Sequence, residues 1–60
     1  MNRLKEFRIA KYLTQQELAD LCGVCLMTIS NVENGKVKPR FSLIRKLSQT
    51  LKVEPEELNF

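Results

Sequence analysis

The sequence predicts an all-α domain of five short helices. Apolar residues recur at the three- and four-residue spacing of a helix face in four segments, which cover residues 2–13, 14–22, 25–34 and 41–51. Local start and stop signals separate these segments, and a proline-led turn at 55–58 follows the last of them. Sixty residues make one small domain, near the lower size limit at which a single core is self-sufficient.

The first two helices have clear signals at their boundary. In segment 2–13, Leu4, Phe7 and Leu13 lie close to helical spacing, and Asn2 is the expected N-cap. Thr14 and Glu17 form a T-x-x-E capping box that opens the second helix. We expect the buried face of this second helix to consist of Leu18, Ala19, Leu21 and Cys22.

Glycine and proline mark the remaining boundaries. Gly23 can adopt a left-handed conformation, so we expect it to end the second helix and turn the chain. The third helix places Ile29 and Val32 on its inner face, and the Asn-Gly pair at 34–35 ends it. Pro39 stops any helix from running through the basic loop that follows, so a fourth helix begins just after it.

The composition argues against an enzyme. The chain has no His, so the commonest general base and the commonest metal ligand are both missing. Its two Cys residues cannot complete a four-ligand zinc site without other donors.

The sequence shows no signal-peptide pattern and no apolar run long enough to cross a membrane. We therefore expect either a complete, soluble, cytoplasmic protein or one module of a longer protein, with no cofactor, no metal and no small-molecule substrate.

The positive charge of the chain is unevenly distributed. The net charge is +3, but Glu54, Glu56 and Glu57 lie together near the C-terminus. The rest of the chain carries ten Lys and Arg residues against four acids, a net charge of +6. Such a charge favours a polyanionic partner, because each phosphate that is neutralised releases condensed counterions. The alternative is a solvated surface that keeps the protein soluble.

Two helices of about eight residues around a Gly-containing turn describe a helix-turn-helix. The run LTQQELADLCGV…TISNVENGKVKP resembles the Cro/C1-type (lambda-repressor-like, XRE) helix-turn-helix family. The resemblance covers nearly all of the chain, so residues 1–60 are taken as a single domain with its helix-turn-helix core at 14–34. The matching positions are Leu13, Thr14, Gln15, Glu17, Leu18, Ala19, Gly23, Val24, Thr28, Ile29, Ser30, Glu33, Asn34, Gly35, Lys36 and Pro39.

The resemblance implies a compact five-helix fold and a sequence-specific transcriptional regulator, preferably a repressor. Such a protein binds a palindromic operator in double-stranded DNA as a homodimer, with its third helix in a major groove. The base-reading positions would be Leu26, Met27, Thr28 and Asn31, with Ser30 at their border. The positions that contact the DNA backbone would be Thr14, Gln15, Asn34, Lys36, Lys38 and Arg40, with a minor groove as the alternative for Arg40. Arg8 and Glu33 match the structural ion pair of the family.

Two features depart from the family pattern. Leu26 and Met27 stand where many relatives have polar residues or Arg, and apolar side chains can pack on thymine methyl groups. Alternatively, one of the two packs against a partner protein or a neighbouring helix. Tyr12 stands where the family often has Gly, and Tyr disfavours a positive φ. We therefore expect the first helix to end less sharply here, with Tyr12 covering the edge of the core.

Cys22 and Cys25 form a C-x-x-C pattern, which in isolation suggests a redox pair or half of a metal site. We favour a simpler interpretation. Cys22 lies on the buried face of its helix, where a free Cys behaves as a small hydrophobe. Cys25 occupies an N-cap position, where a helix N-terminus can lower the pKa of a thiol.

Apolar residues near the C-terminus predict a dimer surface, since exposed apolar groups need a partner. The candidates are Phe41, Val53, Pro55, Leu58 and Phe60. A function of another class is a protein-interaction module of the same fold, such as an antitoxin-like partner. In that case Leu26 and Met27 would bind protein, and the basic loop would only solubilise the surface.

Overall fold

The computed structural model describes residues 2–60, and this part of the chain contains helices and no strand. The four α-helices are α1 (Leu4–Ala10), α2 (Gln15–Cys22), α3 (Leu26–Glu33) and α4 (Phe41–Leu51), and a 3-10 helix η1 (Pro55–Leu58) follows them. The expected all-α class is confirmed. The expected count of five α-helices is wrong, because η1 is a 3-10 helix. Its hydrogen bonds join residues three positions apart, as from the N–H of Glu57 to the carbonyl of Glu54.

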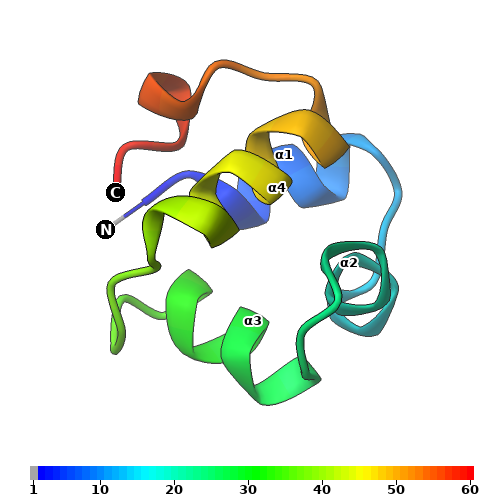
Figure 1. Cartoon of the computed structure of the whole chain (residues 1–60). Helices are drawn as coiled ribbons and strands as arrows, with labels where there is room; N and C mark the ends of the chain where they lie inside the picture. The colour runs from blue at the N-terminus through cyan, green and yellow to red at the C-terminus, as the bar shows by residue number, and fades with distance from the viewer. Residues whose placement is uncertain (1) are drawn as a thin grey trace.

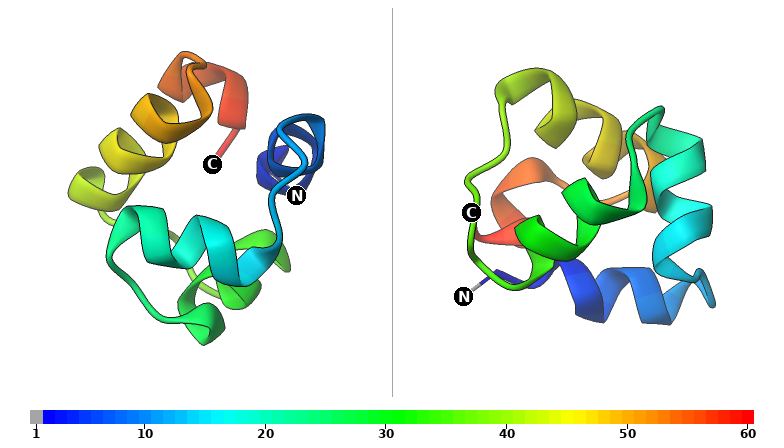
Figure 2. Two further views of the ribbon diagram at one scale, coloured as in Figure 1. Left: turned by 90° about the vertical axis from the view of Figure 1, so that its right-hand side faces the viewer. Right: turned by 90° about the horizontal axis from the view of Figure 1, so that it is seen from below.

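The helices surround one apolar core (Figures 1 and 2). α2 packs against α3 and α4, η1 packs on α4, and α1 contacts α3. The two ends of the chain lie on the same side, where the N–H of Arg3 donates to the carbonyl of Leu58 at 2.9 Å. The core residues are at most 1% exposed, and they are Leu4, Leu18, Ala19, Cys22, Ile29, Val32, Leu47, Leu51 and Leu58.

The burial of two leucines differs from the expectation. Leu21 is 60% exposed, because α2 contacts its neighbours only along the stripe of 18, 19 and 22, and Leu21 lies beyond it. Leu58 has no exposed surface, because η1 folds back on α4 and inserts this side chain into the core. Leu58 therefore stabilises the fold, and its assignment to an exposed dimer surface was wrong.

Side-chain hydrogen bonds fasten the starts of α2 and α1 locally. Thr14 and Glu17 form the expected capping box at the start of α2, with bonds of 3.0 Å and 2.9 Å between each backbone N–H and the other residue's side chain. The expectation that Asn2 is the N-cap of the first helix is wrong, because α1 begins at Leu4 and its N-cap is Arg3, whose side chain makes no capping bond. Asn2 instead accepts from the N–H of Leu4 at 3.1 Å through its side-chain oxygen. The Asn2 amide also donates to the carbonyl of Val32 at 2.6 Å, so it attaches the N-terminus to the last turn of α3.

α1, α2 and α3 end with the same pair of backbone hydrogen bonds. At α2, the N–H of Gly23 donates to Asp20 and that of Val24 to Ala19, and Gly23 has a φ of 71°. This is the Schellman pattern, which requires one left-handed residue after the helix. The corresponding residues after α1 and α3 are Tyr12 and Gly35. After α4, Lys52 is also left-handed, but its N–H and that of Val53 both donate to the carbonyl of Ser48.

Tyr12 adopts the conformation that its residue type disfavours. Its φ is 56°, and its side chain is 94% exposed. Both expectations for Tyr12 were wrong, since α1 ends in a sharp turn and the ring does not cover the core. The physical reason is that the Schellman bonds to Ile9 and Arg8 fix the backbone here whatever the side chain.

Replacement of Tyr12 by Asn should therefore raise the stability of the protein. Asn tolerates the left-handed conformation, whereas most other residues lose roughly 1–2 kcal/mol there, so we expect a gain of about 0.5–1 kcal/mol. Urea unfolding measures the difference. Lys11→Asn is the control, because Lys11 has a φ of −96° and should show no gain. A loss of stability in Tyr12→Asn would contradict the strain inferred here.

Candidate nucleic-acid interface

α2 and α3 form a compact pair joined by a short turn. Ala19 on α2 is fully buried, and its small side chain lets α3 approach closely. Ile29 and Val32 hold the inner side of α3 in the core. The view from below shows α3 across the front of the molecule, with α2 and α1 beside it (Figure 2). One side of α3 is therefore left open to solvent.

The open side of α3 carries the five residues expected to read bases. Leu26 is 42% exposed and Met27 is 65% exposed, while Thr28, Ser30 and Asn31 are each partly exposed. The Thr28 hydroxyl lies 3.2 Å from the Cys25 sulfur, so that hydroxyl is already engaged. The first turn of this surface is thus apolar, and its polar groups lie further along the helix.

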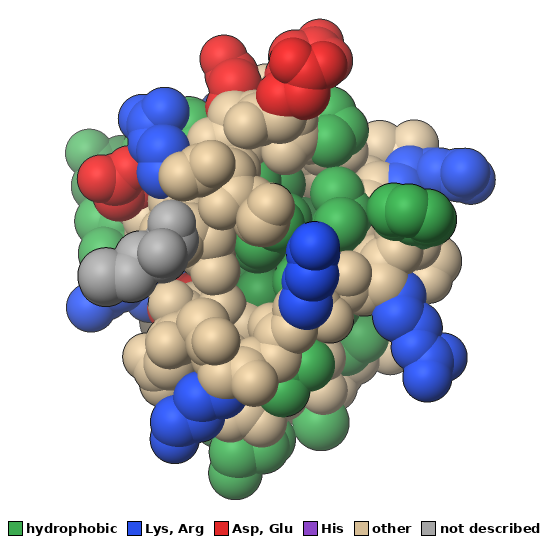
Figure 3. Space-filling view, turned by 90° about the vertical axis from the view of Figure 1, so that its left-hand side faces the viewer, with side chains coloured by type: hydrophobic (Ala, Val, Ile, Leu, Met, Phe, Trp, Pro, Cys, Tyr) green, Lys and Arg blue, Asp and Glu red, His purple; other side chains and the backbone are tan. Residues whose placement is uncertain are grey.

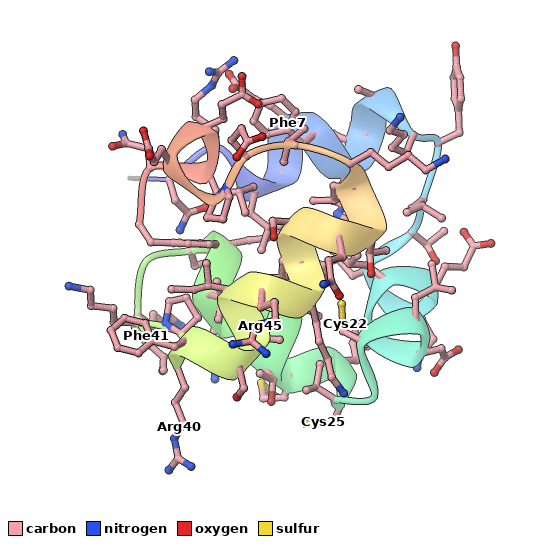
Figure 4. The ribbon with its side chains drawn as sticks, turned by 45° about the horizontal axis from the view of Figure 1, so that its top comes forward. Phe7, Cys22, Cys25, Arg40, Phe41 and Arg45 are labelled. Carbon is pink, nitrogen blue, oxygen red and sulfur yellow. The ribbon has the colours of Figure 1, made fainter. Side chains whose placement is uncertain are left out.

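The loop after α3 brings positive charge next to this surface. Lys36, Lys38 and Arg40 are exposed, and so is Asn34 at the end of α3. Pro39 is buried and anchors the loop between them. In Figure 4, the Arg40 side chain extends away from the start of α4, on the side where Cys25 marks the start of α3.

The acidic groups near the C-terminus lie elsewhere. Glu54, Glu56 and Glu57 are exposed on and beside η1. On the face shown in Figure 3, acidic side chains gather mainly at the top, where η1 lies in Figure 1. Lys and Arg side chains surround the apolar middle and the lower part of the same face. The charge of the domain is therefore separated, with α3 and its loop away from the acids.

Arg8 and Glu33 form a buried ion pair between α1 and α3. Arg8 Nε lies 2.7 Å from Glu33 Oε2, and the two side chains are 11% and 2% exposed. Arg8 Nη2 donates to Glu33 Oε1 at 3.4 Å, and Nη1 donates to the carbonyl of Leu13 at 2.6 Å. The pair therefore joins α1, the connection to α2 and the end of α3.

Sequence reasoning missed one member of this cluster. Gln15, expected to contact the DNA backbone, donates from its side-chain amide to Glu33 Oε1 at 3.1 Å. Thr14, expected to do the same, uses its hydroxyl in the capping box. No local pattern signals the Gln15 contact, because its partner lies 18 positions away in the sequence.

The two cysteines occupy different environments and are not linked. Cys22 is buried beside α4, and this burial raises the pKa of its thiol. Cys25 is exposed at the start of α3, where hydrogen bonds with Thr28 lower the pKa of its thiol. Among residues 2–60, no group of three or more His, Cys, Asp or Glu side chains could hold a metal ion.

The remaining candidates for a dimer surface differ in their exposure to solvent. Phe41 is 89% exposed at the start of α4 and points outward (Figure 4). Pro55 is exposed, whereas Val53 and Phe60 are partly buried against the core. A surface hollow of about 170 Å³ is lined by Asn2, Gly35, Val37, Lys38, Pro39, Asn59 and Phe60.

Breaking the Arg8–Glu33 pair should destabilise the protein strongly. Removing one partner of a buried ion pair leaves the other charge unpaired and costs about 3–5 kcal/mol, so Arg8→Met should lower the free energy of unfolding by that amount. Arg3→Met is the matched control, because the Arg3–Glu6 pair is exposed and should contribute less than about 1 kcal/mol. Urea unfolding compares the two. Equal losses would show that burial does not matter here.

A model of the helix-turn-helix family HTH_3 matches residues 4–58 of the chain. The chain is 44% identical over 57 residues to RghRB of Bacillus subtilis, an uncharacterised HTH-type transcriptional regulator. The matched segment is 93% of this chain but only 41% of that protein. It is also 37% identical to an uncharacterised HTH-type transcriptional regulator of Methanocaldococcus jannaschii, and the matched segment is 95% of this chain and 86% of that protein.

Two crystal structures have the same fold. One is the restriction-modification controller protein C.AhdI from Aeromonas hydrophila, with a TM-score of 0.87 and 41% identity over 93% of this chain and 85% of that one. The other is a hypothetical transcription factor, NHTF, from Neisseria, with a TM-score of 0.87 and 32% identity over 93% of this chain and 63% of that one. In the described part of this chain, no helix is long and apolar enough to span a membrane.

Proposed function

This chain belongs to the XRE-type helix-turn-helix family of transcriptional regulators, and on that basis we propose that it is a sequence-specific repressor that acts by occupying DNA. The family consists of DNA-binding regulators and not of enzymes. The observation that carries the proposal is the open side of α3 beside an exposed basic loop, away from the acidic residues. The likeness to a restriction-modification controller agrees with a regulatory function. We further propose that residues 1–60 act as a single domain, with the helix-turn-helix core at 14–34.

In this proposal α3 enters a major groove. Its eight residues span about 12 Å, which suits a groove about 12 Å wide. Leu26 and Met27 would pack on thymine methyl groups, and Asn31 would read adenine. Thr28 and Ser30 would lie at the edge of the contact. The expected operator therefore has thymine at the positions that face the first turn of α3.

The phosphate contacts surround this helix. Lys36, Lys38 and Arg40 would neutralise phosphates of the DNA, and Asn34 would donate a hydrogen bond to the DNA backbone. The capping box at Thr14 occupies two N–H groups at the start of α2. The N–H groups of Gln15 and its neighbour have no partner within the helix, so this helix end suits a phosphate.

A second copy of the chain would complete the binding unit. Phe41 is 89% exposed and follows Pro39, which lines the hollow of about 170 Å³, closely in the chain. In a twofold pair each Phe41 would occupy the hollow of the other copy. Pro55, Val53 and Phe60 would contribute to the same interface. The acids on this face would then meet the basic side chains of the partner (Figure 3). A small domain makes few DNA contacts, so a homodimer on a palindromic operator gives useful affinity.

Two substitutions separate base reading from backbone contact. Asn31→Ala should reduce the preference for the bound sequence by about 1–3 kcal/mol, while binding to random duplex stays nearly unchanged. Lys38→Ala should weaken both duplexes several-fold and lower the salt slope by about one. Fluorescence anisotropy at several salt concentrations measures both effects. Equal loss on both duplexes for Asn31→Ala, or binding that does not depend on salt, would contradict the proposal and favour a protein partner.

The dimer is tested with two exposed aromatic residues. Phe41→Arg should give a monomer in sedimentation and weaken binding to a two-half-site duplex at least about tenfold, since each half-site contact must then form alone. Tyr12→Arg is the control, because Tyr12 is 94% exposed in the turn that follows α1, whereas Phe41 begins α4. An unchanged dimer in Phe41→Arg would remove the proposed interface.

A further inference from the structure

Gln15 closes the helix-turn-helix at its open end. The chain itself joins α2 to α3 at Gly23, between the end of one helix and the start of the other. The Gln15 side chain belongs to the first residue of α2, and it donates to Glu33, the last residue of α3, at 3.1 Å. The two helices are therefore linked at both ends, once by the backbone and once by this hydrogen bond.

The Glu33 carboxylate needs this donor. It is 2% exposed in its side chain and lies at the C-terminal end of α3, where the helix dipole is negative and disfavours an acid. Arg8 Nε lies 2.7 Å from Oε2, but the Arg8 donor on Oε1 is 3.4 Å away. Gln15 supplies the shorter bond to Oε1. A buried charge without sufficient hydrogen bonds is costly, so this contact matters more than an exposed one.

We propose that Gln15 is a positioning residue, whose side chain fixes the angle between α2 and α3 through Glu33. This inference rests on the proposed function in one respect, namely that the open side of α3 reads bases. Leu26 and Met27 lie at the opposite end of α3 from Glu33, about 10 Å along the helix. A small rotation about the end of α3 therefore displaces the base-reading side chains. The main-chain N–H of Gln15 stays available for a phosphate, so the two functions of this residue are separate.

The chain offers a matched control at the next position. Gln16 is exposed, and its side chain donates to Asp20 at 2.9 Å within α2. Gln15→Met and Gln16→Met make the same chemical change and both keep the backbone N–H. Gln15→Glu adds a carboxylate beside that of Glu33, so it should have a larger effect than Gln15→Met.

The first measurement uses the free protein. Amide NMR spectra of Gln15→Met should show chemical-shift changes along α3 as far as Thr28, larger still in Gln15→Glu, whereas those of Gln16→Met stay within α2. Changes confined to α2 in Gln15→Met would overturn the proposal. Because no DNA is present, this result is independent of whether the protein is a regulator.

The second measurement uses DNA. Gln15→Met should weaken binding to the preferred duplex about tenfold and change binding to random duplex less than twofold, while Gln16→Met changes neither. Equal weakening of both duplexes would mean that the side chain itself contacts a phosphate, and no weakening would mean that the helix angle does not matter; either result overturns the positioning role. If the wild-type protein prefers no sequence, the proposed function fails, and the free-protein spectra still decide whether Gln15 holds α3.

Discussion

The buried ion pair of Arg8 and Glu33 is the interaction on which the remaining structure depends. It places a carboxylate with 2% exposure at the end of α3, and Arg8 also bonds the carbonyl of Leu13, which leads into α2. Neither charge is tolerable alone in this environment. The ends of three segments must therefore meet at one point before the pair is satisfied, and this requirement fixes α3 against the rest of the domain. The core alone does not have this directional character, because apolar packing is less specific about angle.

Backbone hydrogen bonds supply the second constraint. A chain of 60 residues buries only a small core, so the helix ends contribute a large share of the ordered structure. α1, α2 and α3 end in Schellman bonds, and these bonds set φ to positive values at residues as different as Gly23 and Tyr12. Short helices with closed ends produce a rigid scaffold, and the exposed loop of 36–40 is held by it through buried Pro39.

Local signals predicted the elements well, whereas long-range contacts were harder to predict. The capping box at Thr14 and the turn at Gly23 depend on neighbouring residues, so both could be identified from the chain. The family resemblance supplied Arg8 and Glu33. The burial of Leu58 and the bond of Gln15 to Glu33 depend on how distant segments pack, and no spacing rule encodes them. The prediction for Tyr12 was wrong for another reason, because the hydrogen bonds of the turn overrode the preference of Tyr for a negative φ.

In the proposed function α3 reads a specific DNA sequence, and its apolar first turn is the part that departs from the family pattern. Selection of bound duplexes from a random pool tests whether α3 reads bases. We expect enrichment of two inverted half-sites, with centres about one helical turn or a multiple of it apart, and thymine facing Leu26 and Met27. Enrichment of no sequence would contradict sequence-specific binding, and half-sites indifferent to thymine at those positions would contradict the part assigned to Leu26 and Met27.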